Sequence, residues 1–273
     1  RAGCGVTLLL RADAQPGPLR IERGAGCTEL DLPCSWPGRS GAIDHLLVTT
    51  KAYDVYAAVA ATAEALAPGA IVVLMVNGMG LAQQLQTDYP DIALFCATTT
   101  EGAFRLGPRH IRHAGSGATR VGRQGQATAP AWFGTWSEGI PRCSWDADID
   151  AALWHKLAIN AVINPLTALH RCRNGELARR RELREQVEGL CAEVRQVSTA
   201  AGYADTAHTI EASVAQVIAD TAANRSSMLQ DVEAGRATEI DFITGYLLEI
   251  AARHGIVAAR NQTLLEQVKA LGQ

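Results

Sequence analysis

Short apolar runs and amphipathic segments alternate along the first half of the chain. Four continuous apolar runs have the length expected of buried strands: 5–11, 45–51, 70–80 and 93–100. Two segments between them repeat their apolar residues with helical spacing: 53–69, which stops at Pro68-Gly69, and 81–89. Strands and helices that alternate in this way predict a parallel sheet with crossover helices.

The pattern changes over residues 103–145, where short alternating pieces are separated by glycines. We expect antiparallel strands and turns in this segment. The stretch GSGATRVG (115–122) lacks the lysine and the serine or threonine of a phosphate-binding loop, so we interpret it as a hairpin.

From about residue 147 onward the apolar residues keep helical spacing. Helices are expected over 153–169, 174–202, 206–224 and 238–255, the last with Thr238 at its N-cap and Gly255 after its final turn. The predicted fold class is therefore α/β, with a parallel-sheet domain over 1–147 followed by an all-helical domain over 148–273.

The composition is that of a globular protein, with 48% apolar and 19% charged residues. A formal net charge of -3 provides no overall positive field that would attract nucleic acid or an anionic membrane. The arginine-rich run 171–185 is interleaved with glutamates, so a solvated helix with ion pairs is expected there.

Cysteine usage and hydropathy indicate a reducing cytoplasm as the expected compartment. The 7 cysteines are scattered and form no C-x-x-C pair, so we expect neither a disulfide framework nor a metal site. No apolar run approaches the ~20 residues of a membrane span. No signal-peptide pattern is recognised near Arg1.

All four strand runs have polar residues at or near their ends: Arg11, Lys51, Asn77 and Thr98–Thr100. Each one alone carries little weight, because polar residues often follow strands and bond to their own turns. Together at one edge of a parallel sheet they indicate a ligand-binding crevice, since ligands bind beyond the carboxyl ends of such strands.

Arg11 bears on the identity of that ligand. In dinucleotide-binding folds the end of the second strand carries an acid for a ribose hydroxyl or an arginine for a 2′-phosphate. Arg11 favours NADP, whereas Asp13 nearby would suit an unphosphorylated ribose. If 5–11 is this second strand, the first strand and its G-x-G-x-x-G turn belong before Arg1, and we expect ~20 residues of the usual unit to be missing from the sequence.

A polar row interrupts the apolar helix predicted over 153–169. Lys156, Asn160 and Asn164 are spaced four residues apart, which places them on one face of a helix. A single polar residue on such a helix more often has a structural role than a functional one, because an asparagine can cap a neighbouring helix and a lysine can extend its charged end to solvent. An ammonium and two amides on one stripe, amid apolar neighbours, favour a polar ligand, because burying them unpaired would cost a few kcal/mol each.

Seven stretches, in this order, resemble ketopantoate reductases (2-dehydropantoate 2-reductases): LLVTTKAY, VNGMG, ATTTEGAF, LWHKLAINAVINPLTAL, NGEL, SSMLQD and TEIDFITGYLLEIAARHGI. They extend over nearly the whole chain, and KLAINAVINPLTA followed by SSMLQD and TEID is a specific combination. The resemblance implies a Rossmann domain joined to a helical domain like that of 6-phosphogluconate dehydrogenase. It also implies NADPH-dependent reduction of 2-dehydropantoate to (R)-pantoate, on the route to pantothenate and coenzyme A.

The same motifs imply roles for individual residues. Lys156 matches the proton donor of the family. Substrate contacts are implied for Asn77, Asn160, Asn164, Asn174 and Ser227. Cofactor contacts are implied for Arg11, Lys51, Asn77, Ala103 and Glu239. The resemblance assigns no role to Glu101, and the missing glycine turn departs from the family pattern.

The chemistry of the row agrees with a ketone reductase. A hydride arriving at a ketone carbon leaves negative charge on oxygen, which a lysine ammonium can stabilise and then protonate. Two other interpretations stay open: a related reductase of another 2-oxo acid, and a truncated paralogue that binds a ligand without turnover. The expected partner is a small 2-oxo acid rather than nucleic acid or a membrane, and a homodimer is kept open as the assembly.

Overall fold

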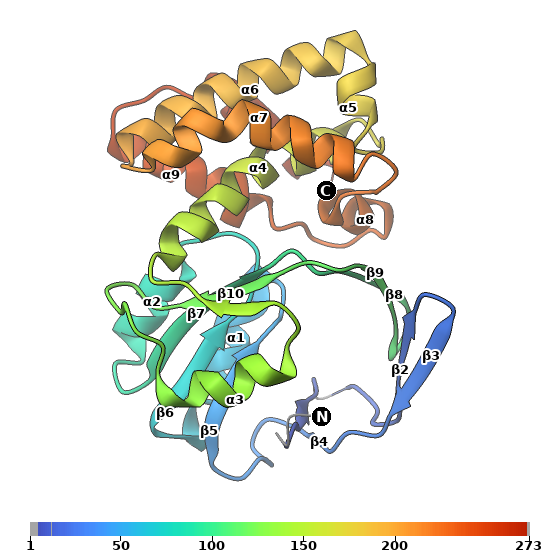
Figure 1. The fold of residues 1–273 in the computed structure, drawn as a ribbon, viewed down its shortest axis with the longest axis vertical. Coiled ribbons are helices and arrows are strands. Elements are labelled where there is room, and N and C mark those ends of the chain that lie inside the picture. The colour runs from blue at the N-terminus through green and yellow to red at the C-terminus, as the bar shows by residue number, and fades with distance from the viewer. Residues whose placement is uncertain (1–4, 12, 272–273) are drawn as a thin grey trace. The chain divides into compact units, whose positions relative to one another are not determined.

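The computed structural model describes residues 5–11 and 13–271 and divides into two compact units (Figure 1). The first unit is α/β and consists of Arg1–Thr50, Asp54–Val76 and Ala82–Ile149. The second is mainly helical and consists of Lys51–Tyr53, Asn77–Leu81 and Asp150–Gln273. Two loops from the α/β half of the sequence therefore pack with the helical half.

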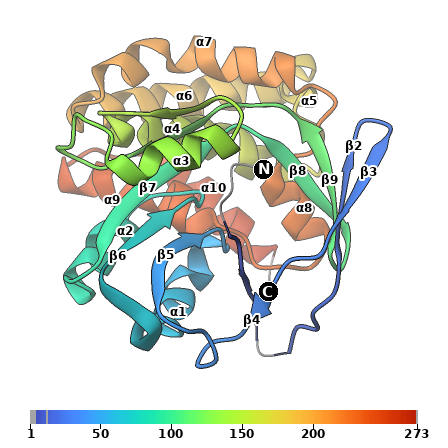
Figure 2. The same cartoon turned by 60° about the horizontal axis from the view of Figure 1, so that its bottom comes forward.

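A five-stranded sheet forms the centre of the first unit, in the order β11-β10-β7-β6-β5. Its members are β5 (Ile43–Val48), β6 (Leu66–Leu74), β7 (Ala93–Thr99), β10 (Thr119–Gly122) and β11 (Cys143–Trp145). The neighbours β5, β6 and β7 are parallel, as the alternating pattern predicts, and lie side by side in Figure 2. β10 runs antiparallel to β7, and β11 runs parallel to β10.

Both faces of this sheet are covered, which explains the continuous apolar runs. Val73, Phe95 and Val121 share one face and pack against Phe133 of α3 (Ala131–Gly139). The alternate residues of these strands point to the opposite face and are also buried, as Val72 shows. The helix α3 was not expected, because the glycine and proline signals around it favoured turns.

The helix predicted over 53–69 is shorter than its periodicity suggests. A 3₁₀ turn (Ala52–Asp54) leads into α1 (Val55–Ala60), a second 3₁₀ turn covers Ala63–Ala65, and β6 already begins at Leu66. Pro68 cannot donate a helical hydrogen bond, and Gly69 has φ of 75°. These two residues place the chain in an extended path before the apolar run begins. The next helix, α2 (Leu81–Asp88), agrees with its prediction.

Two smaller sheets complete the first unit. One has the order β3-β2-β9-β8, with β2 (Leu19–Arg23), β3 (Gly26–Leu30), β8 (Gly102–Gly107) and β9 (His110–Gly115). The other joins β1 (Leu8–Leu9) to β4 (Cys34–Ser35). β2 and β3 are not predicted from the sequence, because their many polar residues hide the alternation of apolar and polar positions that marks a strand.

Two expectations about these strands are wrong. The run 5–11 supplies only a two-residue strand, which pairs with β4 and not with the five-stranded sheet. The stretch 115–122 is not a hairpin: β9 pairs with β2 and β8, whereas β10 pairs with β7 and β11. The chain therefore passes from one sheet to the other here, and Gly117 allows the passage, because a Cβ there would lie 2.1 Å from the Thr100 carbonyl carbon.

The second unit is built around α4 (Ile149–Leu169), which Figure 1 shows among the other helices. These are α5 (Glu176–Arg179), α6 (Arg181–Ala200), α7 (Ala204–Asp220), α8 (Ser227–Glu233), α9 (Tyr246–Arg253) and α10 (Ala259–Ala270), with a π-helical turn at Asp241–Gly245. The helix predicted over 174–202 breaks at Arg180, and the one predicted over 238–255 begins in the π turn. α10 was missed.

Specific polar contacts fix the helices around their apolar core. The Trp154 indole donates to the Ser198 hydroxyl at 2.9 Å, and its ring stacks on Tyr203 with centroids 4.6 Å apart. The Glu193 carboxylate on α6 accepts from the backbone N–H groups of Arg260 and Asn261, at 2.8 and 3.0 Å. It therefore caps the otherwise unsatisfied first turn of α10.

Within the described ranges, no helix combines the length and apolar character needed to cross a bilayer.

Candidate active site

The polar row predicted from sequence lies on α4, in the second unit. Lys156 and Asn160 are half-buried and Asn164 is 7% exposed, while the intervening Leu157 and Ala161 are fully buried. With a rise of ~1.5 Å per residue, successive members of the row are separated by ~6 Å along the helix. The row can therefore contact a small ligand at several points.

Lys156 has an unusual electrostatic environment. Burial lowers the pKa of Lys156 from its ordinary value, and the negative charge of Glu239 opposes part of that shift. A lysine with a lowered pKa releases its proton more readily at neutral pH than an exposed lysine does. This is the property that a proton donor to a ketone oxygen requires.

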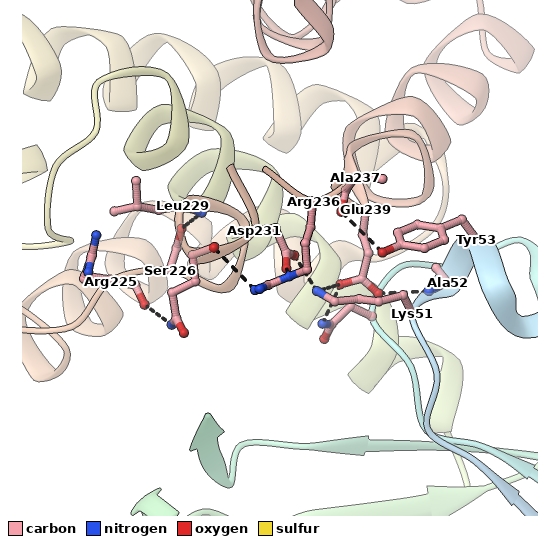
Figure 3. A network of polar contacts seen from close by, with 12 residues as sticks. Lys51, Ala52, Tyr53, Arg225, Ser226, Leu229, Asp231, Arg236, Ala237 and Glu239 are labelled. Atoms are coloured by element: carbon pink, nitrogen blue, oxygen red, sulfur yellow. Dashed lines mark hydrogen bonds and ion pairs between the residues drawn. The ribbon is translucent and has the colours of Figure 1, made fainter. Parts of the chain in front are cut away.

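Glu239 is the centre of a second polar cluster (Figure 3). Its side chain is 4% exposed. Oε1 accepts from the backbone N–H of Ala52 at 3.0 Å. Oε2 accepts from Asn77 Nδ2 at 3.1 Å and lies 3.4 Å from Lys51 Nζ. The structure thus brings together three residues predicted on the cofactor side: Lys51, Asn77 and Glu239.

A further carboxylate, Asp231 of α8, holds Lys51 from the other side (Figure 3). Asp231 Oδ2 lies 2.5 Å from Lys51 Nζ, and Oδ1 accepts from Arg236 Nε at 3.0 Å. Burial disfavours the charged form of Lys51, but the hydrogen bond to Asp231 and the charges of both carboxylates outweigh it and raise the pKa of Lys51. Lys51 therefore stays cationic.

Two glycines allow the VNGMG loop to reach this cluster. A Cβ on Gly78 would lie 2.4 Å from the carbonyl oxygen of Phe242, and one on Gly80 would lie 2.9 Å from the Tyr246 ring. Both glycines also have positive φ, of 84° and 96°. The loop is held against the π turn by a hydrogen bond from Met79 N–H to Phe242 O, at 3.1 Å. This close approach orients Asn77 toward Glu239.

The remaining candidate substrate residues occupy two loops of the second unit. Asn174 is 6% exposed between α4 and α5, and its Nδ2 donates to Thr221 Oγ1 at 2.8 Å. Its Oδ1 is buried without a hydrogen-bond partner, so a donor is needed there. Ser227 is the exposed first residue of α8, whereas the preceding Ser226 is the N-cap and accepts from Leu229 N–H.

Arg11 and Ala103 belong to the first unit. Arg11 is exposed and forms a 2.5 Å ion pair with Asp54, just before α1. Ala103 lies on β8 opposite His113 of β9. Because β1 does not join the five-stranded sheet, the expectation that Arg11 ends a strand of the same sheet as Lys51 and Asn77 is wrong.

Sequence comparison gives the family of this chain. Residues 148–272 match the family model described as "Ketopantoate reductase PanE/ApbA C terminal", and residues 1–126 match "Ketopantoate reductase PanE/ApbA". The chain belongs to the ketopantoate reductase family. A 2-dehydropantoate 2-reductase from Yersinia pestis is 41% identical over 226 residues, which is 82% of this chain and 73% of that protein.

Solved structures share the fold. A PanE/ApbA family ketopantoate reductase from Ralstonia eutropha JMP134 has a TM-score of 0.86 at 23% identity, covering 100% of this chain and 92% of that one. A D-mandelate dehydrogenase solved with NADH and anilino(oxo)acetate has a TM-score of 0.81 at 20% identity, covering 93% and 84%. The Rossmann-like and helical architecture predicted from sequence is therefore confirmed.

A ketopantoate reductase needs a nicotinamide cofactor, and the described residues fit one in part. Parallel strands β5, β6 and β7 end in the polar segments of Lys51, Asn77 and Thr99. The Thr50 hydroxyl, two residues after the end of β5, is buried without a partner and can bind a polar ligand group. The described residues contain no G-x-G-x-x-G turn, so this fit concerns the ends of these strands only.

Sequence reasoning missed Asp231 and Arg236 in this reductase. Asp231 is the last residue of the quoted SSMLQD motif, but an aspartate on a short helix gives no sign of its burial. Its 2% exposure between two cations is a tertiary property. A lysine at the end of one strand would still have been a reason to search for a buried carboxylate partner.

Proposed function

We propose that this chain reduces 2-dehydropantoate to (R)-pantoate with NADPH as hydride donor. One observation carries the proposal: Lys156, with its lowered pKa, begins a row with Asn160 and Asn164 on α4. The name of the relative from Yersinia pestis, 2-dehydropantoate 2-reductase, supports the choice of substrate.

In the proposed reaction the nicotinamide cofactor supplies a hydride to the ketone carbon. Lys156 holds a proton at Nζ, stabilises the negative charge that develops on the ketone oxygen and transfers the proton to it. Its partial burial keeps the pKa low, which makes this transfer easier.

The neighbouring amides bind the rest of the substrate. Asn160 and Asn164 offer donors and acceptors to a carboxylate or hydroxyl without adding charge beside Lys156. The buried, unpartnered Oδ1 of Asn174 suits a hydroxyl donor, and 2-dehydropantoate carries one at its far end. Ser227 supplies a further exposed hydroxyl.

Glu239 orients the residues on the cofactor side. It accepts from Asn77 and Ala52 and neutralises part of the charge of Lys51. Its own charge favours the protonated form of Lys156 before the reaction. We therefore assign Glu239 an electrostatic and orienting role.

A comparison of substrates tests the function. The purified chain is expected to oxidise NADPH with 2-dehydropantoate at a kcat/KM about a hundredfold or more above that with 2-oxoisovalerate, which lacks the hydroxyl, because polar groups of the site would be left unpaired. Equal values for both acids would favour a reductase of another 2-oxo acid. Absence of turnover with a wider set of 2-oxo acids would favour a non-catalytic paralogue.

Arg11 is proposed to select NADPH over NADH. Its guanidinium is 76% exposed and pairs with the carboxylate of Asp54, which a 2′-phosphate can replace. We expect Arg11→Ala to weaken NADPH binding by about tenfold or more and NADH binding by much less. Fluorescence titration with each cofactor measures this difference. Equal weakening of NADPH and NADH binding would remove the assignment of Arg11 as the residue that binds the 2′-phosphate.

A further inference from the structure

Glu101 has no role in the proposed reaction, and it stands two residues before Ala103, a predicted cofactor contact. We propose that Glu101 is a positioning residue: together with His113 and the Gly117 amide it fixes the backbone at Ala103, and thereby strengthens cofactor binding. This inference rests on the proposed nicotinamide-dependent function. It concerns the first unit alone and is independent of the row on α4.

The carboxylate of Glu101 joins two segments that are distant in sequence. Glu101 stands between the end of β7 at Thr99 and the start of β8 at Gly102. Its Oε2 accepts from His113 Nε2 on β9 at 2.5 Å, and the backbone N–H of Gly117 also donates to the carboxylate. These hydrogen bonds, with the charge of Arg142, lower the pKa of Glu101, so it is an anion at neutral pH.

The backbone beside Glu101 is tied to the same crossover. Thr100 N–H donates to Ala118 O at 3.0 Å, and Ala118 N–H donates to Thr100 Oγ1 at 2.9 Å. A Cβ on Gly117 would lie 2.3 Å from Glu101 N, so only glycine permits this approach. The segment that precedes β10 therefore holds the backbone at the start of β8 in place.

An irregularity in the ladder makes the side-chain contact important for Ala103. β8 and β9 pair as Gly102 with Gly115 and then as Ala103 with His113, with a register shift between the two pairs. Backbone pairing across such a shift is locally disrupted. The Glu101–His113 contact spans the shift and connects the residue opposite Ala103 to the end of β7 (β8 and β9 are labelled in Figure 2).

The opposite face of the same sheet supplies a matched control. Glu22 on β2 binds His110 Nε2 at 2.8 Å and also pairs with Arg112, both on β9. Residues alternate between faces along a strand, so His110 and Arg112 point away from the face that carries His113 and Ala103. A carboxylate–imidazole pair of the same type therefore exists in the same sheet without contact to the cofactor-side face.

Titration of the chain with NADPH, without substrate, tests the inference. Glu101→Ala is expected to raise the Kd of NADPH about tenfold, the typical value of a lost charge-assisted contact, and to raise the KM for NADPH in parallel. The values of kcat and of KM for the oxo-acid substrate should stay within about twofold, because Glu101 does not touch the reacting atoms. Glu101→Gln should recover most of the affinity, since its carbonyl oxygen can still accept from His113. Glu22→Ala should leave the Kd unchanged.

Two further results overturn the inference. An unchanged Kd in Glu101→Ala would do so, and so would an equal rise in Glu22→Ala, which would indicate general weakening of the sheet. If Glu101→Ala does not fold, as judged by thermal melting, His113→Leu makes the same test from the other side of the contact, because leucine has no hydrogen-bond donor for the Glu101 carboxylate. A wild-type chain that binds neither NADPH nor NADH would contradict the proposed function instead.

Discussion

Replacement of Lys156 by alanine is expected to reduce kcat for 2-dehydropantoate by roughly 10²-fold or more while NADPH binding stays close to wild type. The lysine is the cation aligned with Asn160 and Asn164, and no other residue of the row can donate a proton to an alkoxide. Removing it deprives the transition state of both charge stabilisation and proton transfer. Single-turnover kinetics, with a separate NADPH titration, distinguish this loss from a loss of binding.

The chain offers a matched control for this substitution, because it contains only three lysines: Lys51, Lys156 and Lys269. Lys269 lies on α10, is half-exposed and pairs with Asp241 at 2.5 Å. Lys269→Ala should keep wild-type turnover. Near-normal turnover in Lys156→Ala would refute the role of proton donor.

The second large effect is expected from Glu239→Gln. The substitution preserves shape but turns Oε2, which accepts from Asn77 and lies near Lys51, into a donor. Loss of hydrogen bonds to a charged acceptor costs about 1.5–3 kcal/mol each, so turnover should fall by roughly tenfold to a hundredfold. Steady-state kinetics with both substrates measure the fall.

The same variant should change the pH dependence of the reaction. Lys156 must be protonated to donate, so the rate falls as the pH rises through its pKa, which burial already lowers. The negative charge of Glu239 raises that pKa, and its removal lowers the pKa further. The alkaline decline of kcat should therefore move to lower pH in Glu239→Gln.

Asp231→Asn removes an equal charge from the same cluster and serves as the comparison. Asp231 contacts Lys51 and Arg236, whereas the carboxylate whose charge raises the pKa of Lys156 is that of Glu239. The alkaline decline should stay in place in Asp231→Asn. A decline that moves equally in both variants would show that the effect of Glu239 on Lys156 is not specific.

The fold could be predicted from the sequence where the pattern of a strand or helix and its burial in the core both require apolar residues at the same positions. The strands β5, β6 and β7 are buried on both faces, so their apolar runs were unmistakable, and α4 is surrounded by core on most sides. The pattern failed for β2 and β3, which are largely exposed, and for the segment around Pro68 and Gly69. In that segment the backbone restrictions of Pro68 and Gly69 end the helix earlier than the spacing of the apolar residues predicts.

The spacing of residues along the chain predicts only those parts of the site that lie on a single helix or strand. Lys156, Asn160 and Asn164 share one helix, so their alignment follows from the sequence. Motif order suggested Lys51, Asn77 and Glu239, and the structure brings these three into contact. Asp231 could not be found in this way, because its partners lie 180 and 5 residues away along the chain. The roles of all these residues in catalysis stay predictions.

Because the segments Lys51–Tyr53 and Asn77–Leu81 pack with the helical unit, that unit cannot be excised at the predicted boundary between residues 147 and 148 without damage. A severed helical fragment would retain Glu239 but would lose the ammonium, the carboxamide and the main-chain amide that solvate its carboxylate. It would also uncover the surface of Phe242 and Tyr246 against which the two loop glycines rest. The second unit is therefore assembled from segments of both halves of the sequence. A fragment that folds independently and keeps the Glu239 cluster intact must include both halves.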